Sequence, residues 1–461
     1  YAQGFSSASM SRIAATTEGY GMFAVVEYAA GTPNLNYIDR TRIGATGHSA
    51  GGNAAIRGAN FFGKQAIETG QPSKLHSVFV SGYVLTLRED VLEDVRSNVG
   101  VSYAFYDEGA YRNELKNGDM RYAPEAIRAV NSGLRFHGES IEEVELGRYY
   151  GSKPDRTLRI VHNERVLHPF QPYIVEATAN QIEYFERVFE IDSGLANDDQ
   201  VWYWKELLGL ISLIAALVAV IPMGRLLLEI SWFRPLVHPL PPALAKPKGR
   251  GKVLFWSLFV IGASIACFTY SPMAELSQKL FVAASTRQQT WFFPQRMNNA
   301  VMLWAVLNGS VGYLMFWLSY RFFGKRNGVT PAVWGAGTSF SELVRTFALA
   351  FALFLFFFLV LFTIYYFLHV DYRFLFMGVR TFQPPLLVLL AMYVPFFFIF
   401  LLSNSLRING AMRFEGESEW KSMLVGGFGN SLGLMFIVIV QYLTFAVTGT
   451  VYWTDGWLYV N

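Results

Sequence analysis

A short glycine-rich stretch, GHSAG at 47–51, has the residue types and spacing of a turn that presents a reactive serine. The residues before it, Arg42–Thr46, predict a buried strand, and a helix is predicted from 53 to about 67. On such a strand–turn–helix the central residue, Ser49, is strained, and only small residues fit two positions on either side. Its hydroxyl could attack a carbonyl carbon while the backbone N–H of Ala50 faces the developing oxyanion. The alternative is a glycine-rich turn without chemistry.

The wider stretch DRTRIGATGHSAGG at 39–52 resembles the α/β-hydrolase superfamily, in particular its esterase, dienelactone-hydrolase and prolyl-oligopeptidase-like branches. Those branches often read D-x-x-R-I-G-x-x-G-H-S-x-G-G at this place. The resemblance covers roughly residues 10–190. It implies an α/β-hydrolase domain in which the serine is followed along the chain by an acid and then by a histidine.

The acid of that series is expected just after a strand. Strands are predicted at 76–82 and 98–106, and Asp107 directly follows the second of them. This position favours Asp107 over its neighbour Glu108 as the acid. The alternative for both is the solvated end of a loop.

The histidine of the superfamily lies in a loop between the last strand and a final helix. Here the last strand is predicted at 157–161 and the helix at 174–189. His168 fits the loop, whereas His162 still lies at the strand end and is expected to pack or to form a hydrogen bond. His48, beside the serine, is expected to line the pocket wall or to pack.

These residues together predict a nucleophilic mechanism. Ser49 attacks a carbonyl, His168 takes the serine proton and later protonates the leaving group, and Asp107 holds the imidazole in the correct tautomer. No cofactor is expected, and no metal, because no His/Asp cluster has ligand spacing.

The resemblance also implies strands that this sequence does not contain. In the superfamily the serine turn ends the fifth strand of the sheet, but only 41 residues precede Arg42. A helix is predicted at 12–29. We expect the earlier strands, and the loop with the second oxyanion donor, in about a hundred upstream residues of the natural chain. The alternative is that another chain supplies them.

The apolar face of the helix predicted at 12–29 consists of Met22, Val25, Val26 and Ala29.

The composition divides the chain into two parts. Charged residues make up 16 % and hydrophobic residues 52 %, which excludes a disordered chain and an ordinary cytosolic enzyme. Residues 1–205 have a net charge of −6 and residues 206–461 one of +9. We therefore expect a catalytic domain at 1–200 and a transmembrane domain at 201–461.

The second part contains six apolar stretches, each close to the ~20 residues that a helix needs to cross the hydrocarbon core. They predict an all-α transmembrane domain of about six helices after the α/β-hydrolase domain. The stretches are 207–228, 253–272, 299–320, 346–369, 385–404 and 428–450.

The distribution of basic residues predicts the orientation. The first, third and fifth loops together carry twelve basic residues and the second and fourth carry five, so the first set is expected in the cytoplasm. Residues 1–205 and the tail Trp453–Asn461 then lie outside the cytoplasm, at the plasma membrane. The first set consists of Arg234, Lys246, Lys248, Arg250, Lys252, Arg321, Lys325, Arg326, Arg345, Arg407, Arg413 and Lys421.

The sequence thus predicts a membrane-anchored serine hydrolase that cleaves esters, lipid esters included, outside the cytoplasm. Amidase or peptidase activity stays open, as does assembly into a homo-oligomer or a membrane complex. The alternative is a transport or complex-forming subunit with a vestigial hydrolase domain, although the scarcity of ionisable groups in the spans argues against an ion-coupled carrier. Expected partners are the bilayer and an ester substrate. No basic stripe interleaved with aromatics suggests nucleic acid.

Overall fold

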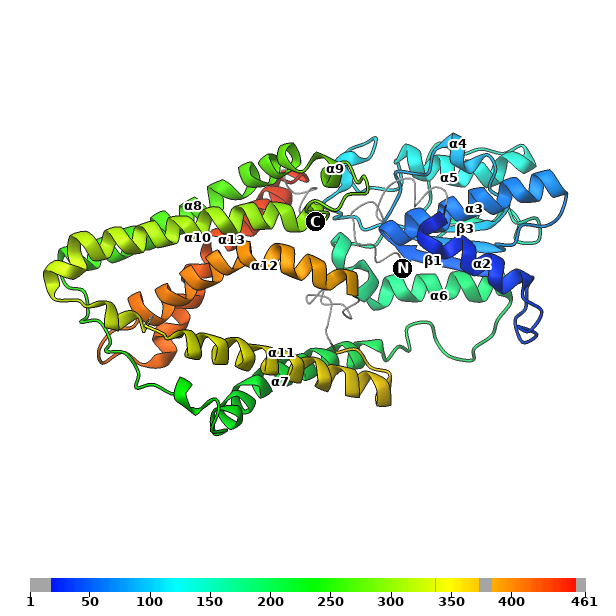
Figure 1. Ribbon diagram of the computed structural model, residues 1–461. Helices are drawn as coiled ribbons and strands as arrows, with labels where there is room; N and C mark the ends of the chain where they lie inside the picture. The colour runs from blue at the N-terminus through cyan, green and yellow to red at the C-terminus, as the bar shows by residue number, and fades with distance from the viewer. Residues whose placement is uncertain (1–17, 336, 373–383, 453–461) are drawn as a thin grey trace. The chain divides into compact units, whose positions relative to one another are not determined.

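The computed structural model describes residues 18–335, 337–372 and 384–452 (Figure 1). Its contacts group the chain into two compact units, and each is described by itself. The first is built on the residues up to Gln200, with Phe281–Arg296 and Ile439–Leu458. The second holds Val201–Leu280 and Met297–Val438. The predicted domain limits, 1–200 and 201–461, stay predictions.

The first unit contains a parallel sheet of four strands in the order β1-β2-β3-β4. All four predicted strands are present, with bounds that differ by a few residues from those predicted. Because parallel neighbours need crossover connections, helices and long loops separate the strands in the sequence. The strands are β1 (Gly44–His48), β2 (Ser77–Ser81), β3 (Asn98–Ser102) and β4 (Arg159–His162).

Helices cover both faces of this sheet (Figure 1). Side chains of a strand alternate between the two faces, so Val78 and Val80 of β2 join one core, whereas Phe79 and Tyr184 join the other. Such double cover is what a parallel sheet requires. The helices are α2 (Met22–Gly31), α3 (Ala50–Thr69), α4 (Glu89–Leu92), α5 (Pro124–Leu134) and α6 (Val175–Phe189).

The prediction of a buried strand at Arg42–Thr46 is wrong in two respects. The strand begins at Gly44 and runs on to His48. It is also poorly buried, with Gly44 and Thr46 exposed. The reason is its place in the sheet, because within the described part of the chain β1 pairs with β2 alone.

The first helix also differs from its prediction. Residues 12–17 lie outside the described residues, and α2 begins at Met22. Its buried side chains are Phe23 and Val26, whereas Val25, predicted on the same face, is 66 % exposed. Phe23 decides the orientation, because its ring stacks on that of Phe61 in α3 with 4.6 Å between centroids.

Over the described residues the chain has six helices long and apolar enough to cross a membrane, which confirms the prediction of about six long apolar helices. At most 22 % of the most apolar segment of each helix is buried within the protein. Their apolar side chains thus face outward, as lipid contact requires, and mark the chain as an integral membrane protein. The helices are α7 (Trp202–Leu228), α8 (Arg250–Leu280), α10 (Arg296–Ser319), α11 (Phe340–Leu368), α12 (Pro384–Leu406) and α13 (Glu419–Thr448).

Small residues let the helices of the second unit approach closely. A Cβ on Gly309 of α10 would lie 2.8 Å from the backbone of Phe400 in α12. A Cβ on Gly433 of α13 would meet the Ala263 carbonyl of α8 at 2.6 Å. Such contacts are typical of membrane helices. The side of the membrane on which each loop lies stays a prediction, and the tail Trp453–Asn461 lies outside the described residues.

Candidate active site

The three predicted catalytic residues all follow strands at the carboxyl edge of the sheet. Ser49 directly follows β1, Asp107 lies five residues beyond β3, and His168 lies six residues beyond β4. In a parallel sheet the carboxyl ends of all strands meet at one edge, where ligands of α/β proteins bind. The topology thus brings this edge together from segments far apart in the sequence.

The segments after β3 and β4 stay hydrogen-bonded beyond the regular strands. The N–H of Phe105 donates to the carbonyl of Glu164 at 2.7 Å, and that of Tyr106 donates to the carbonyl of Val166 at 3.1 Å. Asp107, the residue after Tyr106, is therefore held opposite the helical turn η5 (His168–Tyr173).

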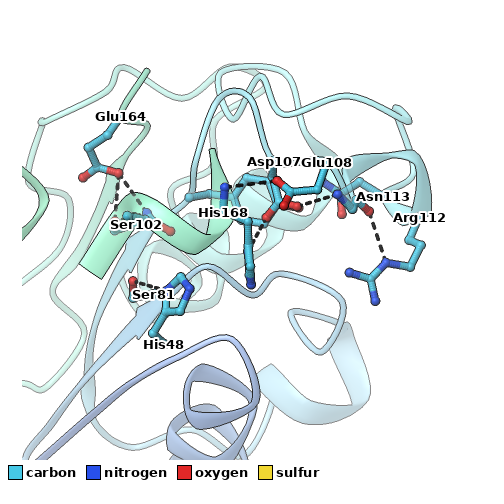
Figure 2. Close-up of polar contacts among 12 residues, drawn as sticks. His48, Ser81, Ser102, Asp107, Glu108, Arg112, Asn113, Glu164 and His168 are labelled. Carbon is cyan, nitrogen blue, oxygen red and sulfur yellow. Dashed lines mark hydrogen bonds and ion pairs between the residues drawn. The ribbon is translucent and has the colours of Figure 1, made fainter. Parts of the chain in front are cut away.

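His168 and Asp107 form a direct pair in this place (Figure 2). Nδ1 of His168 lies 2.7 Å from Oδ2 of Asp107, and the other carboxylate oxygen accepts the N–H of Gly109, also at 2.7 Å. Asp107 is 2 % exposed, so it is not part of a solvated loop end. Glu108 instead accepts the backbone N–H of His168 at 3.2 Å. The geometry pairs the imidazole with Asp107, and Glu108 holds its backbone.

Burial and the charge of Asp107 oppose each other in their effect on the pKa of His168 but act together on the pKa of Glu108. Burial lowers the pKa of His168, but the hydrogen bond and negative charge of Asp107, aided by Glu108, outweigh it, so the pKa is raised above its ordinary value. The pKa of Glu108 is also raised, first by burial and then by the charge of Asp107. Beside Asp107, the imidazole of His168 therefore stays protonated to a higher pH than an imidazole in water does.

Ser49 has the backbone conformation of a strained turn. Its φ of 57° and ψ of −115° are rare for a residue with a side chain, and such strain costs about 1–3 kcal/mol. Ser49 is the N-cap of α3, a position where a serine hydroxyl usually accepts a helix N–H, yet here its hydroxyl makes no cap hydrogen bond. Its N–H donates to the carbonyl of Ser81 at 2.8 Å. The Ser49 hydroxyl therefore has no cap hydrogen bond that would have to break before it could react.

Glycines on both sides of Ser49 permit this turn. A Cβ on Gly47 would lie 2.4 Å from the backbone of Gly51, so no side chain fits there. The expectation of the same restriction at Gly51 is wrong, because a Cβ on Gly51 has no neighbour within 4 Å. The restriction falls on Gly52 instead, whose Cβ would meet the Ser81 carbonyl at 2.8 Å. Of the two consecutive glycines after Ala50, Gly52 is thus the one that permits close packing of the helix on the sheet.

His48 connects the serine turn with the His168 pair. Its ring lies 4.6 Å from the ring of His168, centroid to centroid, and its Nδ1 lies 3.1 Å from the hydroxyl of Ser81 (Figure 2). Burial, followed by the charge of His168, lowers the pKa of His48 to about 4, so it is neutral at pH 7. In the described part of the chain no hydrogen bond joins Ser49 Oγ to His168. Catalytic hydrogen bonds are often long before substrate binds.

The structure also shows where the last two residues singled out in the sequence, Ala50 and His162, lie. Ala50 is the first residue of α3, so its N–H has no acceptor within the helix. An anion at that helix end would be stabilised by the N–H and by the helix dipole. His162 lies on β4, is 9 % exposed and packs near the ring of Phe79, with 6.4 Å between centroids.

A buried polar network at the same edge was not predicted from the sequence. Glu164, 2 % exposed, accepts a hydrogen bond from Ser102 at 2.9 Å (Figure 2). It also accepts hydrogen bonds from Gln171 at 3.0 Å and from Asn180 at 2.9 Å. Gln171 belongs to η5, the turn that begins at His168, so the network fixes this turn to β3 and β4. The polar Ser102 at the end of the apolar strand β3 is the sequence signal that could have indicated it.

Within the described ranges, His, Cys, Asp and Glu side chains form no group of three or more that could hold a metal ion. Comparison with protein-family models, with curated proteins and with solved structures finds no match to this chain.

Proposed function

We propose that this chain is a membrane-anchored serine hydrolase of the α/β-hydrolase type that cleaves esters. One observation carries the proposal. A strained Ser49, whose hydroxyl makes no cap hydrogen bond, shares the carboxyl edge of a parallel sheet with the hydrogen-bonded pair His168–Asp107. Strain at a polar residue is a mark of functional sites. An imidazole held by a buried carboxylate is the usual partner of a nucleophilic serine.

In the proposed reaction Ser49 Oγ bonds to the ester carbonyl carbon, and its proton passes to Nε2 of His168. The carbonyl oxygen becomes an oxyanion beside the N–H of Ala50. The imidazolium then gives its proton to the leaving alcohol as the C–O bond breaks. Water repeats the sequence on the acyl-enzyme and releases the acid, while Asp107 keeps Nδ1 protonated and offsets the imidazolium charge.

The six apolar helices support a role at the bilayer, on lipid esters or on soluble esters near the surface. We propose that the catalytic domain lies outside the cytoplasm, on the basis of the excess of basic residues in and beside the first, third and fifth of the loops predicted from the sequence. Amides and peptides react by the same acyl transfer and are the second substrate class to test.

A second candidate is a transport or complex-forming membrane subunit in which the hydrolase domain has lost its activity. The observation that favours it is the lack, over the described residues, of a hydrogen bond between Ser49 and His168. In an active enzyme, substrate binding would have to bring the Ser49 hydroxyl and the His168 ring within hydrogen-bond distance.

The two candidates are separated by ester hydrolysis with the purified full chain in lipid nanodiscs. We expect turnover of p-nitrophenyl butyrate, or of a bilayer-borne ester such as dioleoylglycerol, that Ser49→Ala lowers by about 10⁴-fold or more. Ser193→Ala, at an exposed serine outside the site, is the matched control. Faster turnover of the bilayer-borne ester would identify a lipid substrate, and turnover unchanged in Ser49→Ala would contradict the proposal.

A further inference from the structure

The second unit contains a pocket among α8, α10, α12 and α13 that the proposed hydrolase does not use. These helices are in contact around it. Trp304 of α10 donates from its indole nitrogen to the Ala266 carbonyl of α8 at 2.8 Å, and Gly309 packs on α12. The pocket is notable for its polar lining inside a membrane domain, which consists of Asn308, Asn404, Arg407 and Asn430.

Arg407 belongs to a membrane helix and not, as expected, to the fifth loop. The fifth span was predicted to end at residue 404, but α12 continues into a π-helical turn, η10 (Arg407–Ala411). The candidate span therefore runs from Leu386 to Ala411 and includes the arginine. Single π-helical turns are frequent at functional sites.

The charge of Arg407 has no counter-charge in the described part of the chain, where no carboxylate forms a salt bridge with it. Its guanidinium donates to Oδ1 of Asn404 at 2.8 Å and to Oδ1 of Asn430. Its Nε is buried and has no hydrogen-bond partner among the residues that the structure describes. A cation in a membrane span is costly unless it is paired, and such residues mark functional sites.

The two asparagines leave donors at the pocket. A guanidinium has only donors, so both amide oxygens face it and both amide nitrogens point elsewhere. Neither Asn404 Nδ2 nor Asn430 Nδ2 has a hydrogen-bond partner in the described residues, and both residues line the pocket. One cation and two amide donors match a single oxyanion, because every contact is then charge-assisted.

We propose that this pocket binds a phosphate group, held by Arg407, Asn404 and Asn430. The phosphate comes either from a membrane phospholipid or from a free phosphate. Arg407 lies close to the end of its candidate span, from which a long side chain can reach a lipid headgroup, and this suits the lipid source. The single charge of a phosphodiester also balances the single charge of the guanidinium.

Native mass spectrometry of the full chain in detergent tests the proposal. The probes are dioleoylphosphatidylglycerol, which carries a phosphodiester, and dioleoylglycerol, which lacks it. Both are measured on the Ser49→Ala chain, so that neither ester is cleaved. We expect binding of the first to depend on Arg407. Any binding of the second, at the proposed hydrolase site, should not depend on Arg407. Arg407→Gln should weaken binding of the phospholipid by about tenfold or more, and Asn404→Ala and Asn430→Ala should each weaken it by several-fold. Inorganic phosphate separates the sources: displacement of the lipid indicates a site open to free phosphate, and no displacement indicates a lipid site.

Arg326→Gln is the matched control, because it removes the same charge from an exposed loop position. It should leave binding unchanged. Three results would overturn the proposal: a loss of dioleoylglycerol binding in Arg407→Gln equal to that of the phospholipid, equal losses in Arg326→Gln and Arg407→Gln, or wild-type binding by the pocket variants. If Arg407→Gln does not fold, the two asparagine variants, which keep the charge, decide the question.

Discussion

Nδ1 of His168 lies 2.7 Å from Oδ2 of Asp107, although 61 residues separate the two in the sequence. The Asp107 carboxylate can only accept this hydrogen bond, so it fixes the proton of the neutral ring on Nδ1. The lone pair is then on Nε2, the atom that would take the proton of Ser49. This relationship makes the candidate site testable, because the charge of Asp107 affects the basicity of His168.

Replacing Asp107 by Asn should lower both the rate and the pH at which activity appears. His168 acts as a base only when neutral, and Asp107 raises its pKa, so activity of the wild type rises with pH through a value above 6.5. Without the Asp107 carboxylate, only the smaller effect of Glu108 opposes burial, which lowers that pKa. We therefore expect the rise of kcat/KM to move to lower pH in Asp107→Asn, together with a fall in kcat of about 10⁴-fold.

The measurement is a pH–rate profile on the purified full chain. Asp155→Asn, at an exposed aspartate outside the site, should keep the wild-type profile. A loss of rate without any movement of the profile would show that Asp107 acts only on folding or stability, contrary to its role beside His168.

The choice between two histidines gives a second prediction. His168→Ala should lower esterase activity by about 10³-fold or more, because the general base is lost. His162→Ala should leave kcat close to that of the wild type and lower thermal stability instead, since its ring packs near Phe79 within the sheet. Steady-state kinetics and a thermal melt of each variant distinguish the two. The reverse pattern would transfer the role of the base to His162.

Alanine substitutions in the glycine motif give a third prediction. Gly47→Ala should destabilise the protein by about 1–3 kcal/mol, since the new Cβ would lie 2.4 Å from the Gly51 backbone. Gly51→Ala should be neutral or stabilise by up to about 1 kcal/mol, because it has free space and a helical position. Melting temperatures of the two variants provide the comparison. Equal destabilisation by both would mean that the turn differs from the one described.

The orientation of the chain gives a fourth prediction. Cys267 is the single cysteine and is buried, so cysteines can be introduced into a Cys267→Ser background. A membrane-impermeant maleimide should label Asp198→Cys in intact cells and should fail to label Lys248→Cys, although both positions are exposed in the folded chain. Labelling of Lys248→Cys alone would reverse the orientation inferred from the basic loops.

The sequence predicted those parts of the fold that depend on local pattern. Alternating and continuous apolar runs marked the four strands and the six spans, and the position of Asp107 after a strand favoured it over Glu108. The exposure of Val25 and of β1 was not predictable, because burial depends on neighbours contributed by other segments. The Glu164 network and the environment of Arg407 were missed for the same reason. Glu164 bonds to residues 7, 16 and 62 positions away, and Arg407 bonds to Asn430 of another helix.

The most direct test of the account is to ask whether Ser49 is a nucleophile. The purified full chain is treated with a fluorophosphonate probe, which phosphonylates an activated serine hydroxyl, and the modified peptide is identified by mass spectrometry. We predict a single adduct on Ser49 that is absent in Ser49→Ala, much slower to form in His168→Ala and unchanged in Ser193→Ala. A folded wild-type chain that forms no adduct, or an adduct that persists in Ser49→Ala, would contradict the central claim.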